Sequence, residues 1–245
     1  MGDRYFVDKP IIGNDVTLSG AEAHHLLHVM RARAGTEITL FDGSGAEFTG
    51  RIQQVARDRL ELTIVERREA DRESRVQLTL GVALPKGDRQ RWLLEKAVEL
   101  GVTHFVAIDT ARAIVRPNDG TLERLRRTVI EASKQCGRNR LMDVSTTAWP
   151  EFLRDAPAAA LRLIAHPGGS ADRIVSPVAA ESQASQPSAV WAAVGPEGGF
   201  TDPEVAAAIE LGWQRLDLGT RILRIETAAA AIAALASFGQ LAPSA

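Results

Sequence analysis

Short apolar segments that alternate with helical patterns dominate the sequence from residue 76 onward. These segments show almost no polar alternation, and they span residues 76–83, 105–108, 161–165 and 189–194. Helical patterns lie between the segments, at residues 88–100 and 121–134. Strands that are apolar on both faces and joined by helices are typical of a mainly parallel sheet covered on both sides. We therefore predict an α/β domain in this part of the chain.

The first 72 residues show a different, β-rich pattern. Alternating apolar residues on both sides of residues 42–45 predict a hairpin, and residues 60–64 continue the alternation as a further strand. Ser19-Gly20-Ala21-Glu22 predicts a capping box before a short helix at residues 24–30. Residues 66–75 are densely charged and lack apolar periodicity, so the domain boundary is placed there. We predict two domains, residues 1–72 and 73–245.

The composition excludes several classes of protein. With 45% hydrophobic and 24% charged residues, the chain has the composition of a globular protein. No apolar run approaches the roughly 20 residues that a membrane-spanning helix needs, and the N-terminal segment lacks the apolar core of a secretory signal. The single cysteine, Cys136, excludes an internal disulfide framework and a multi-cysteine zinc site. We expect a cytoplasmic protein with no membrane or metal partner.

Basic residues are concentrated between residues 111 and 142, although the net charge of the whole chain is −2. Eight basic and three acidic side chains fall in this segment. Its stretch Lys134-Gln135-Cys136-Gly137-Arg138-Asn139-Arg140 has the composition of an exposed loop that faces phosphates. A solvated helix face would explain the same excess of charge without a ligand, so both interpretations stand.

Three segments near the carboxyl ends of predicted strands could hold a ligand, as is usual in open α/β sheets. They are residues 165–169, 194–204 and 216–227. In the second, glycines allow a ligand to approach the backbone, and either a Thr201–Glu204 capping box or Asp202 with Pro203 begins a helix. The lysine of a P-loop and the dinucleotide pattern are both missing. A nucleoside-like ligand is favoured, with a plain strand-to-helix turn as the alternative.

The ordered motifs of the chain resemble those of the 16S ribosomal RNA uridine-N3 methyltransferase family. The C-terminal pair is Gly195-Pro196-Glu197-Gly198-Gly199-Phe200 and Leu218-Gly219-Thr220-Arg221-Ile222-Leu223-Arg224, the latter followed by Glu226-Thr227-Ala228. Further matches run along most of the chain, at residues 28–31, 40–43, 71–74, 86–87, 95–102, 131–140 and 166–167. The chain departs from the family pattern at Ala111, where Glu is frequent, and at Ile225, where Thr is usual.

The resemblance implies a fold, a cofactor and partners. The N-terminal part would be a PUA-like β-barrel that grips RNA. The C-terminal part would be a SPOUT domain, an α/β domain whose last segments form a trefoil knot, although such knots are rare in proteins in general. The methyl donor S-adenosylmethionine would bind in the knot, near a homodimer interface, and the substrate would be 16S rRNA in the small ribosomal subunit.

The resemblance also assigns residues to a cofactor pocket, which backbone groups and apolar side chains would form. The assigned residues are Leu163, His166, Pro167, Val194, Gly195, Pro196, Glu197, Gly198, Gly199, Leu218, Gly219, Ile222, Leu223, Arg224 and Thr227. Ordinary core packing is the alternative for the apolar members, and a structural role is the alternative for His166.

Arg224 is the predicted catalytic residue. Uridine N3 carries a proton and becomes nucleophilic only when that proton leaves, so a guanidinium beside the base would stabilise the developing anion. Glu197 or Glu226 would accept the proton. The alternative for Arg224 is an ion pair with Glu226 or Glu197 that only holds the fold.

Phosphate contacts are predicted for a set of basic residues, namely Arg31, Arg33, Lys86, Arg112, Lys134, Arg138 and Arg140. Cys136 is interpreted as a packing thiol, and the group His24, His25 and His28 as a surface feature and not a metal site. Two other functions stay open: methylation of a ribose 2′-OH in rRNA or tRNA, and a non-catalytic RNA-binding assembly factor that has kept the fold.

Overall fold

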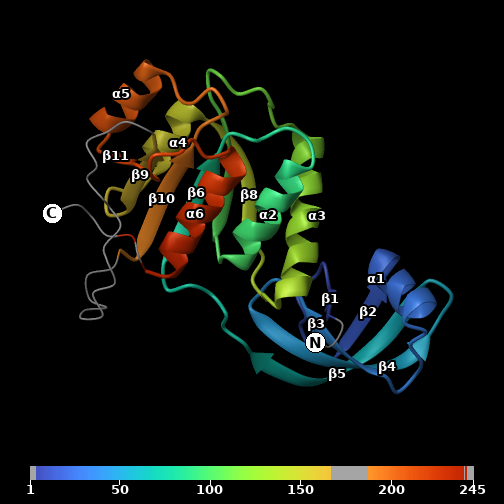
Figure 1. Ribbon diagram of the computed structural model, residues 1–245. Helices are drawn as coiled ribbons and strands as arrows, with labels where there is room; N and C mark the ends of the chain where they lie inside the picture. The colour runs from blue at the N-terminus through green and yellow to red at the C-terminus, as the bar shows by residue number, and fades with distance from the viewer. Residues whose placement is uncertain (1–3, 167–186, 240, 242–245) are drawn as a thin grey trace. The chain divides into compact units, whose positions relative to one another are not determined.

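A computed structural model of the chain describes residues 4–166, 187–239 and 241 (Figure 1). The chain divides into two compact units. The N-terminal unit comprises residues 1–73 together with residues 130–141, and the C-terminal unit comprises residues 74–129 and 142–245. The sequence pattern places a single boundary after residue 72, because nothing in it indicates that a later segment joins the first unit.

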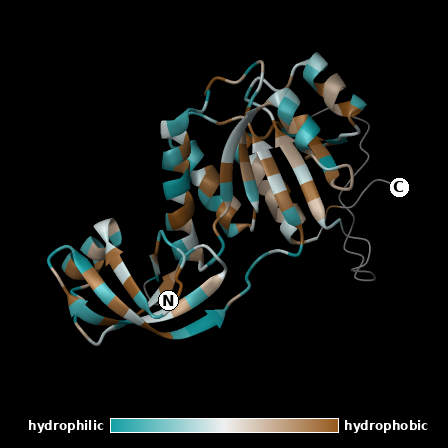
Figure 2. Cartoon of the chain, turned by 180° about the vertical axis from the view of Figure 1, so that it is seen from behind, coloured by the Kyte–Doolittle hydropathy of each residue, from teal (hydrophilic) through white to brown (hydrophobic). Residues whose placement is uncertain are grey.

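The N-terminal unit is built on a five-stranded sheet. Its strand order is β1-β3-β4-β5-β2, and β1 and β2 are the outer strands. The predicted hairpin is confirmed, since β3 and β4 pair in antiparallel fashion around residues 42–45. Hydrophobic and hydrophilic residues alternate along these strands, and the C-terminal end of β5 is hydrophilic (Figure 2). The strands are β1 (Arg4–Phe6), β2 (Asp15–Ser19), β3 (Glu37–Phe41), β4 (Ala46–Val55) and β5 (Arg59–Glu69).

The predicted short helix is present, but it is built differently from the expectation. An α-helical turn, α1 (Gly20–His24), continues into one turn of π-helix, η1 (His25–Val29). The predicted capping box is wrong, because the side chain of the N-cap residue Ser19 makes no capping hydrogen bond. Glu22 instead accepts a hydrogen bond from Lys134 Nζ at 2.8 Å. A contact distant in sequence has thus replaced the local one.

The C-terminal unit contains the predicted parallel sheet. Six strands run parallel in the order β11-β9-β10-β6-β7-β8. The sequence pattern did not indicate the two outer strands, β8 and β11, because β8 is largely exposed and β11 is only three residues long. The strands are β6 (Gln77–Val82), β7 (His104–Asp109), β8 (Asp143–Ala148), β9 (Leu161–Ala165), β10 (Ala189–Val194) and β11 (Gln214–Leu216).

Helices cover both faces of this sheet. Figure 1 shows α2 and α6 on one face, where α6 packs against β6, β10 and α2, and α4 on the other. An aromatic cluster fills the α4 side, with the rings of Trp149 and Phe200 4.5 Å apart. The helices are α2 (Arg89–Glu99), α3 (Asp119–Cys136), α4 (Trp149–Asp155), α5 (Asp202–Glu210) and α6 (Ile225–Ser237). Within the described residues, every helix is too short or too polar to cross a membrane.

Candidate active site

The carboxyl ends of the six parallel strands bring separate loops of the C-terminal unit to one edge of the sheet. Of the three segments singled out in the sequence, residues 194–204 and 216–227 lie at this edge around the ends of β10 and β11, and residues 165–166 lie at the end of β9, while residues 167–169 lie outside the described residues. Backbone hydrogen bonds join neighbouring strand ends there: His166 N donates to Leu216 O at 3.2 Å, and Ala83 N donates to Val194 O at 3.0 Å. The edge is therefore a candidate active site.

The glycine-rich loop after β10 is tightly folded. A Cβ atom on Gly195 would lie 2.9 Å from the Phe200 ring, so this position requires glycine. Gly199 has a φ of +69° and its N–H donates to Pro196 O at 2.8 Å, which closes a turn. The Thr201–Glu204 capping box is confirmed: Thr201 N donates to Glu204 Oε2 at 2.8 Å, and Glu204 N donates to Thr201 Oγ1 at 3.4 Å.

The loop after β7 holds the glycine loop from the side. Arg112 Nη1 donates to Gly198 O at 2.6 Å, and Ala111 N donates to Glu204 Oε1 at 2.8 Å. The contact at residue 111 uses only the backbone, so it does not need the glutamate that is frequent in the family. The other departure, Ile225, has a buried side chain at the start of α6, where an apolar residue packs well.

Arg89 joins two glutamates, one from the loop after β10 and one from the first turn of α6. Its Nη2 donates to Glu197 Oε1 at 2.8 Å, and its Nη1 lies 3.7 Å from Glu226 Oε2. No motif in the sequence singles out Arg89. Its position at the start of the helix that follows β6 could have indicated it, since that helix also begins at the carboxyl edge.

Four polar atoms at this edge are buried without a hydrogen-bond partner among the described residues. They are Asp109 Oδ1, Thr110 Oγ1, His166 Nδ1 and Glu226 Oε2. Glu226 is a buried carboxylate, with only 7% of the residue exposed. Buried polar groups are normally hydrogen-bonded, so such atoms indicate a place where a polar ligand can supply the missing partner.

The loop between β11 and α6 is open to solvent. Gly219 has a φ of +106°, and its N–H donates to Asp217 Oδ1 at 2.8 Å. Ile222 is 96% exposed, although it is apolar, while Leu218 and Leu223 are half-buried. These apolar side chains of one loop are accessible to a ligand or a second chain.

Arg224 is the N-cap residue of α6, and it is exposed. The structure gives its guanidinium no ion pair with Glu197 or Glu226 within the described part of the chain, and Arg89 contacts both carboxylates instead. Its predicted alternative role, holding the fold by such an ion pair, is therefore wrong. Thr227, in the first turn of the same helix, is exposed as well.

The remaining residues predicted for the cofactor pocket differ in burial. Leu163 and Val194 are buried within the sheet, and Pro196 is buried in the turn after β10. Their side chains therefore belong to the core, and only backbone atoms of Val194 and Pro196 lie at the edge. Pro167 lies outside the described residues.

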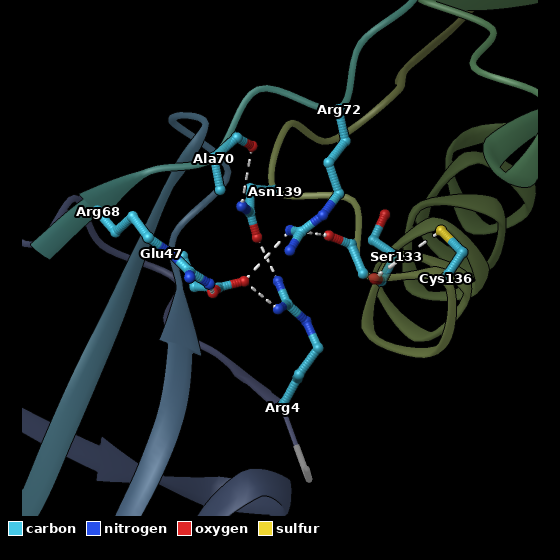
Figure 3. A network of polar contacts seen from close by, with 9 residues as sticks. Arg4, Glu47, Arg68, Ala70, Arg72, Ser133, Cys136 and Asn139 are labelled. Atoms are coloured by element: carbon cyan, nitrogen blue, oxygen red, sulfur yellow. Dashed lines mark hydrogen bonds and ion pairs between the residues drawn. The ribbon is translucent and has the colours of Figure 1, made fainter. Parts of the chain in front are cut away.

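A buried polar network holds residues 130–141 in the N-terminal unit (Figure 3). Glu47 pairs with Arg4 and Arg68, and Arg72 Nη1 lies 3.2 Å from Glu47 Oε2. Arg72 also donates to Gly137 O at 2.7 Å, and Asn139 accepts a hydrogen bond from Arg4.

Burial raises the pKa of Glu47, but the arginine hydrogen bonds outweigh this effect and lower the pKa to about 2.

This network corrects the expectation of an exposed, phosphate-facing loop. Arg138 and Asn139 are buried, and Arg138 forms a bidentate ion pair with Glu73, with Nε–Oε1 at 2.9 Å and Nη2–Oε2 at 2.5 Å. Lys134 belongs to α3 and pairs with Glu22, and its pKa is raised because this partner outweighs the effect of burial. Both cations are neutralised within the protein. The excess of positive charge in the sequence did not indicate this, because the partners are distant in the chain.

The other predicted phosphate-binding residues are exposed. Arg31, Arg33 and Arg140 belong to the N-terminal unit, and Lys86 lies in the loop after β6. The guanidinium of Arg140 lies over Gly45, where an added Cβ would be 3.0 Å from Nε. Among the described residues, no group of three side chains is arranged to hold a metal ion.

Comparison with known proteins gives two family matches. Residues 72–237 match an RNA methyltransferase domain, and residues 18–65 match an RNA methyltransferase PUA domain. Curated relatives called ribosomal RNA small subunit methyltransferase E match along most of the chain. The Synechocystis protein is 34% identical over 90% of this chain and 72% of its own length. The Bacillus subtilis protein is 32% identical over 92% of each chain.

Solved structures agree with these matches. The ribosomal RNA small subunit methyltransferase E of Neisseria gonorrhoeae, bound to S-adenosylmethionine, superposes with a TM-score of 0.81 and 33% identity over 96% of both chains. A Legionella pneumophila protein in complex with the same cofactor gives a TM-score of 0.84 and 30% identity, again over 96% of both chains.

Proposed function

The chain belongs to the RNA methyltransferase family, and from this we propose that it methylates N3 of a uridine in 16S rRNA, with S-adenosylmethionine as methyl donor. The observation that carries the proposal is the carboxyl edge of the C-terminal sheet. A tight glycine loop, unpartnered buried polar atoms and an exposed arginine lie at this edge. The names of the relatives, which are small-subunit rRNA methyltransferases, and the cofactor in two similar structures support it.

The residues at this edge fit the proposed cofactor. Glu226 Oε2, which has no hydrogen bond within the described residues, can accept hydrogen bonds from the hydroxyl or ammonium groups of the ligand, and His166 Nδ1 can form a hydrogen bond with the ligand as well. Exposed Ile222 and half-buried Leu218 and Leu223 provide apolar surface for the adenine ring. When bound, S-adenosylmethionine supplies an electrophilic methyl group.

The protein must then make uridine N3 nucleophilic. Removal of the N3 proton leaves negative charge on the uracil oxygens, and we assign Arg224 to stabilise it, because its guanidinium is exposed and has no carboxylate partner among the described residues. We assign Glu197 to accept the proton. Its side chain is 38% exposed, and Arg89 binds only one of its oxygens, so the other can reach a substrate. Glu226 is buried and is assigned to the cofactor.

The finer features of the family are part of the same proposal. We propose that the segments around β9, β10 and β11 form the trefoil knot of the SPOUT class, and that the active protein is a cytoplasmic homodimer. Phosphate contacts are assigned to the exposed residues Arg31, Arg33, Lys86 and Arg140. Arg112 positions the glycine loop, while Lys134 and Arg138 stabilise the N-terminal unit.

The experiment that tests this function uses methyl-labelled donor and unmethylated small ribosomal subunits, with naked 16S rRNA and tRNA as parallel substrates. Nucleoside mass spectrometry then identifies the product. We expect 3-methyluridine, chiefly on assembled subunits. Detection of a 2′-O-methyl nucleoside would show that the protein is an RNA methyltransferase whose acceptor is a ribose hydroxyl and not uridine N3. No transfer, together with no calorimetric binding of the donor, would make the protein an RNA-binding factor instead.

A further inference from the structure

The N-terminal unit contains a cavity of about 490 Å³ that is separate from the proposed active site. Tyr5, Leu26 and Ile38 contribute apolar lining, and Thr39 and Thr49, which face each other across β3 and β4, contribute hydroxyl groups. This volume is in the range of small-ligand sites, which are mostly apolar and carry a few polar groups.

One side of the cavity is formed by the segment that follows the π-helical turn. Met30 is 47% exposed and lines the cavity next to Arg31. Arg31 has a φ of +52°, the one positive φ at a non-glycine residue in the described part of the chain. Met30 N donates to His25 O at 3.1 Å and Ala32 N donates to Leu26 O at 2.9 Å, so hydrogen bonds on both sides hold this conformation. Short π-helical turns and strained residues of this kind occur often at functional sites.

Two cations line the same side. Arg31 and Arg33 are exposed, and the structure gives neither guanidinium a carboxylate partner within the described residues. The acidic residue of the lining, Glu37, accepts a hydrogen bond from Arg51 Nη2 at 2.7 Å and is therefore already neutralised. The lining thus combines positive charge, hydroxyl groups and apolar side chains.

We propose that this cavity binds one unpaired nucleotide of the rRNA substrate, other than the nucleotide that is methylated. An arginine side chain can contact the phosphate or stack on the base, and the apolar side chains of the lining can contact the base itself, which suits the recognition of unpaired RNA bases. The proposal rests on the proposed function, because that function supplies RNA as the ligand. It adds a second contact point, which would set the position of the RNA on the protein.

The test compares a charge variant with a cavity-filling variant in the full-length protein. Binding of a 16S rRNA fragment is measured by fluorescence anisotropy without methyl donor. Arg31→Ala/Arg33→Ala removes the cations, and Thr49→Phe fills the cavity while both arginines stay. We expect each to weaken binding roughly tenfold, the size of one lost stacking contact. The matched controls are Arg57→Ala and Thr17→Phe, which alter exposed residues that do not line the cavity; we expect them to bind as the parent does.

A crosslinking experiment identifies the nucleotide. A photoreactive phenylalanine analogue replaces Met30 in one protein and the exposed neighbour Val29, which does not line the cavity, in another. We expect the Met30 probe to mark a single unpaired nucleotide that differs from the methylated one. If Thr49→Phe binds RNA normally while the double arginine variant binds weakly, the arginines bind RNA as surface charges without the cavity, and the proposal is overturned. So would equal, scattered crosslinks from both probes.

These outcomes test RNA binding by the cavity independently of the proposed methyl transfer. If the parent protein transfers no methyl group but binds RNA, the proposed function fails, and the binding ratios of the variants still decide the proposal. Unchanged melting temperatures of the variants show that their binding losses do not come from unfolding. If Thr49→Phe does not fold, the smaller Thr49→Val, which removes only the hydroxyl, and the Met30 crosslink carry the test.

Discussion

Arg89 Nη2 donates to Glu197 Oε1 at 2.8 Å, and the same guanidinium lies 3.7 Å from Glu226 Oε2. The two carboxylates come from the loop after β10 and from the first turn of α6, and Arg89 begins α2. One cation thus connects three segments of the proposed active site. Its removal would leave the buried carboxylate of Glu226 without a counter-charge.

Replacement of Arg89 by Met tests this connection. We expect kcat to fall by about tenfold or more, because Glu197 loses its orientation. Arg89→Lys should recover part of the activity, since it keeps the charge but not the bidentate geometry. Initial rates with labelled donor give both values, and Arg91→Met, on an exposed position of the same helix, is the control. Full activity in Arg89→Met would exclude a positioning role.

Glu197 and Glu226 should respond differently to amide substitution. Glu197→Gln is expected to lower kcat by roughly 10²-fold or more while donor affinity stays unchanged, because the amide cannot accept the N3 proton. Glu226→Gln is expected to weaken donor binding in calorimetry. If Glu226→Gln alone abolishes turnover at saturating donor, the proton acceptor is Glu226 and our assignment is reversed.

Arg224→Ala should remove activity while the fold is kept. The side chain is exposed at the N-cap of α6, so its loss costs little stability, whereas loss of charge stabilisation at the reacting base lowers kcat by about 10²-fold or more. Arg221→Ala, which removes an exposed arginine from the same loop, is the matched control. Methyl transfer and thermal melting are measured on both variants. A normal rate for Arg224→Ala counts against its catalytic role.

The Glu47 network should make the N-terminal unit sensitive to acid. The folded-state pKa of Glu47 is lowered to about 2, below its ordinary value of 4.5, so its stabilisation is present above pH 4.5 and is lost as the pH falls toward 2. Glu47→Gln should cost roughly 3–5 kcal/mol at neutral pH, because the buried guanidinium of Arg4 loses the negative charge with which it pairs. Urea unfolding between pH 2 and pH 7 measures both effects. If the free energy of unfolding depends on pH in the same way in parent and variant, Glu47 is not the cause of the acid sensitivity.

Arg138 and Arg140 should separate stability from RNA binding, although they are two residues apart. Arg138→Ala is expected to destabilise the protein by about 3 kcal/mol, because Glu73 loses its bidentate partner. Arg140→Ala is expected to leave stability nearly unchanged and to reduce the salt dependence of RNA binding by about one phosphate contact. Chemical unfolding and salt titrations of RNA affinity provide the comparison. The reverse pattern would restore Arg138 as a phosphate contact.

The local sequence was sufficient where the determining contacts are local. The apolar segments 76–83 and 189–194 predicted central strands of a parallel sheet, and the Thr201–Glu204 spacing predicted a capping box that the structure contains. The glycine loop after β10 was located correctly at the carboxyl edge, because a chain that leaves a parallel strand must turn there. The period of apolar residues, the spacing of capping residues and the turn residues are visible in the sequence, without knowledge of the segments that pack against them.

Only the tertiary structure decided where the long-range partners lie. Ser19 to Glu22 has the spacing of a capping box, yet Glu22 pairs with Lys134, 112 residues away. The basic stretch around Arg138 has the composition of an exposed loop, yet Glu73 and the Glu47 network enclose it. The position of Arg89 at the start of α2 places it at the carboxyl edge, but its role follows from the loop after β10 and the first turn of α6, which fold toward it. An ion pair between distant residues depends on the path of the whole chain. The sequence alone therefore determined the central strands, the main helices and the edge of the site, while folding decided which charges are neutralised and which stay exposed.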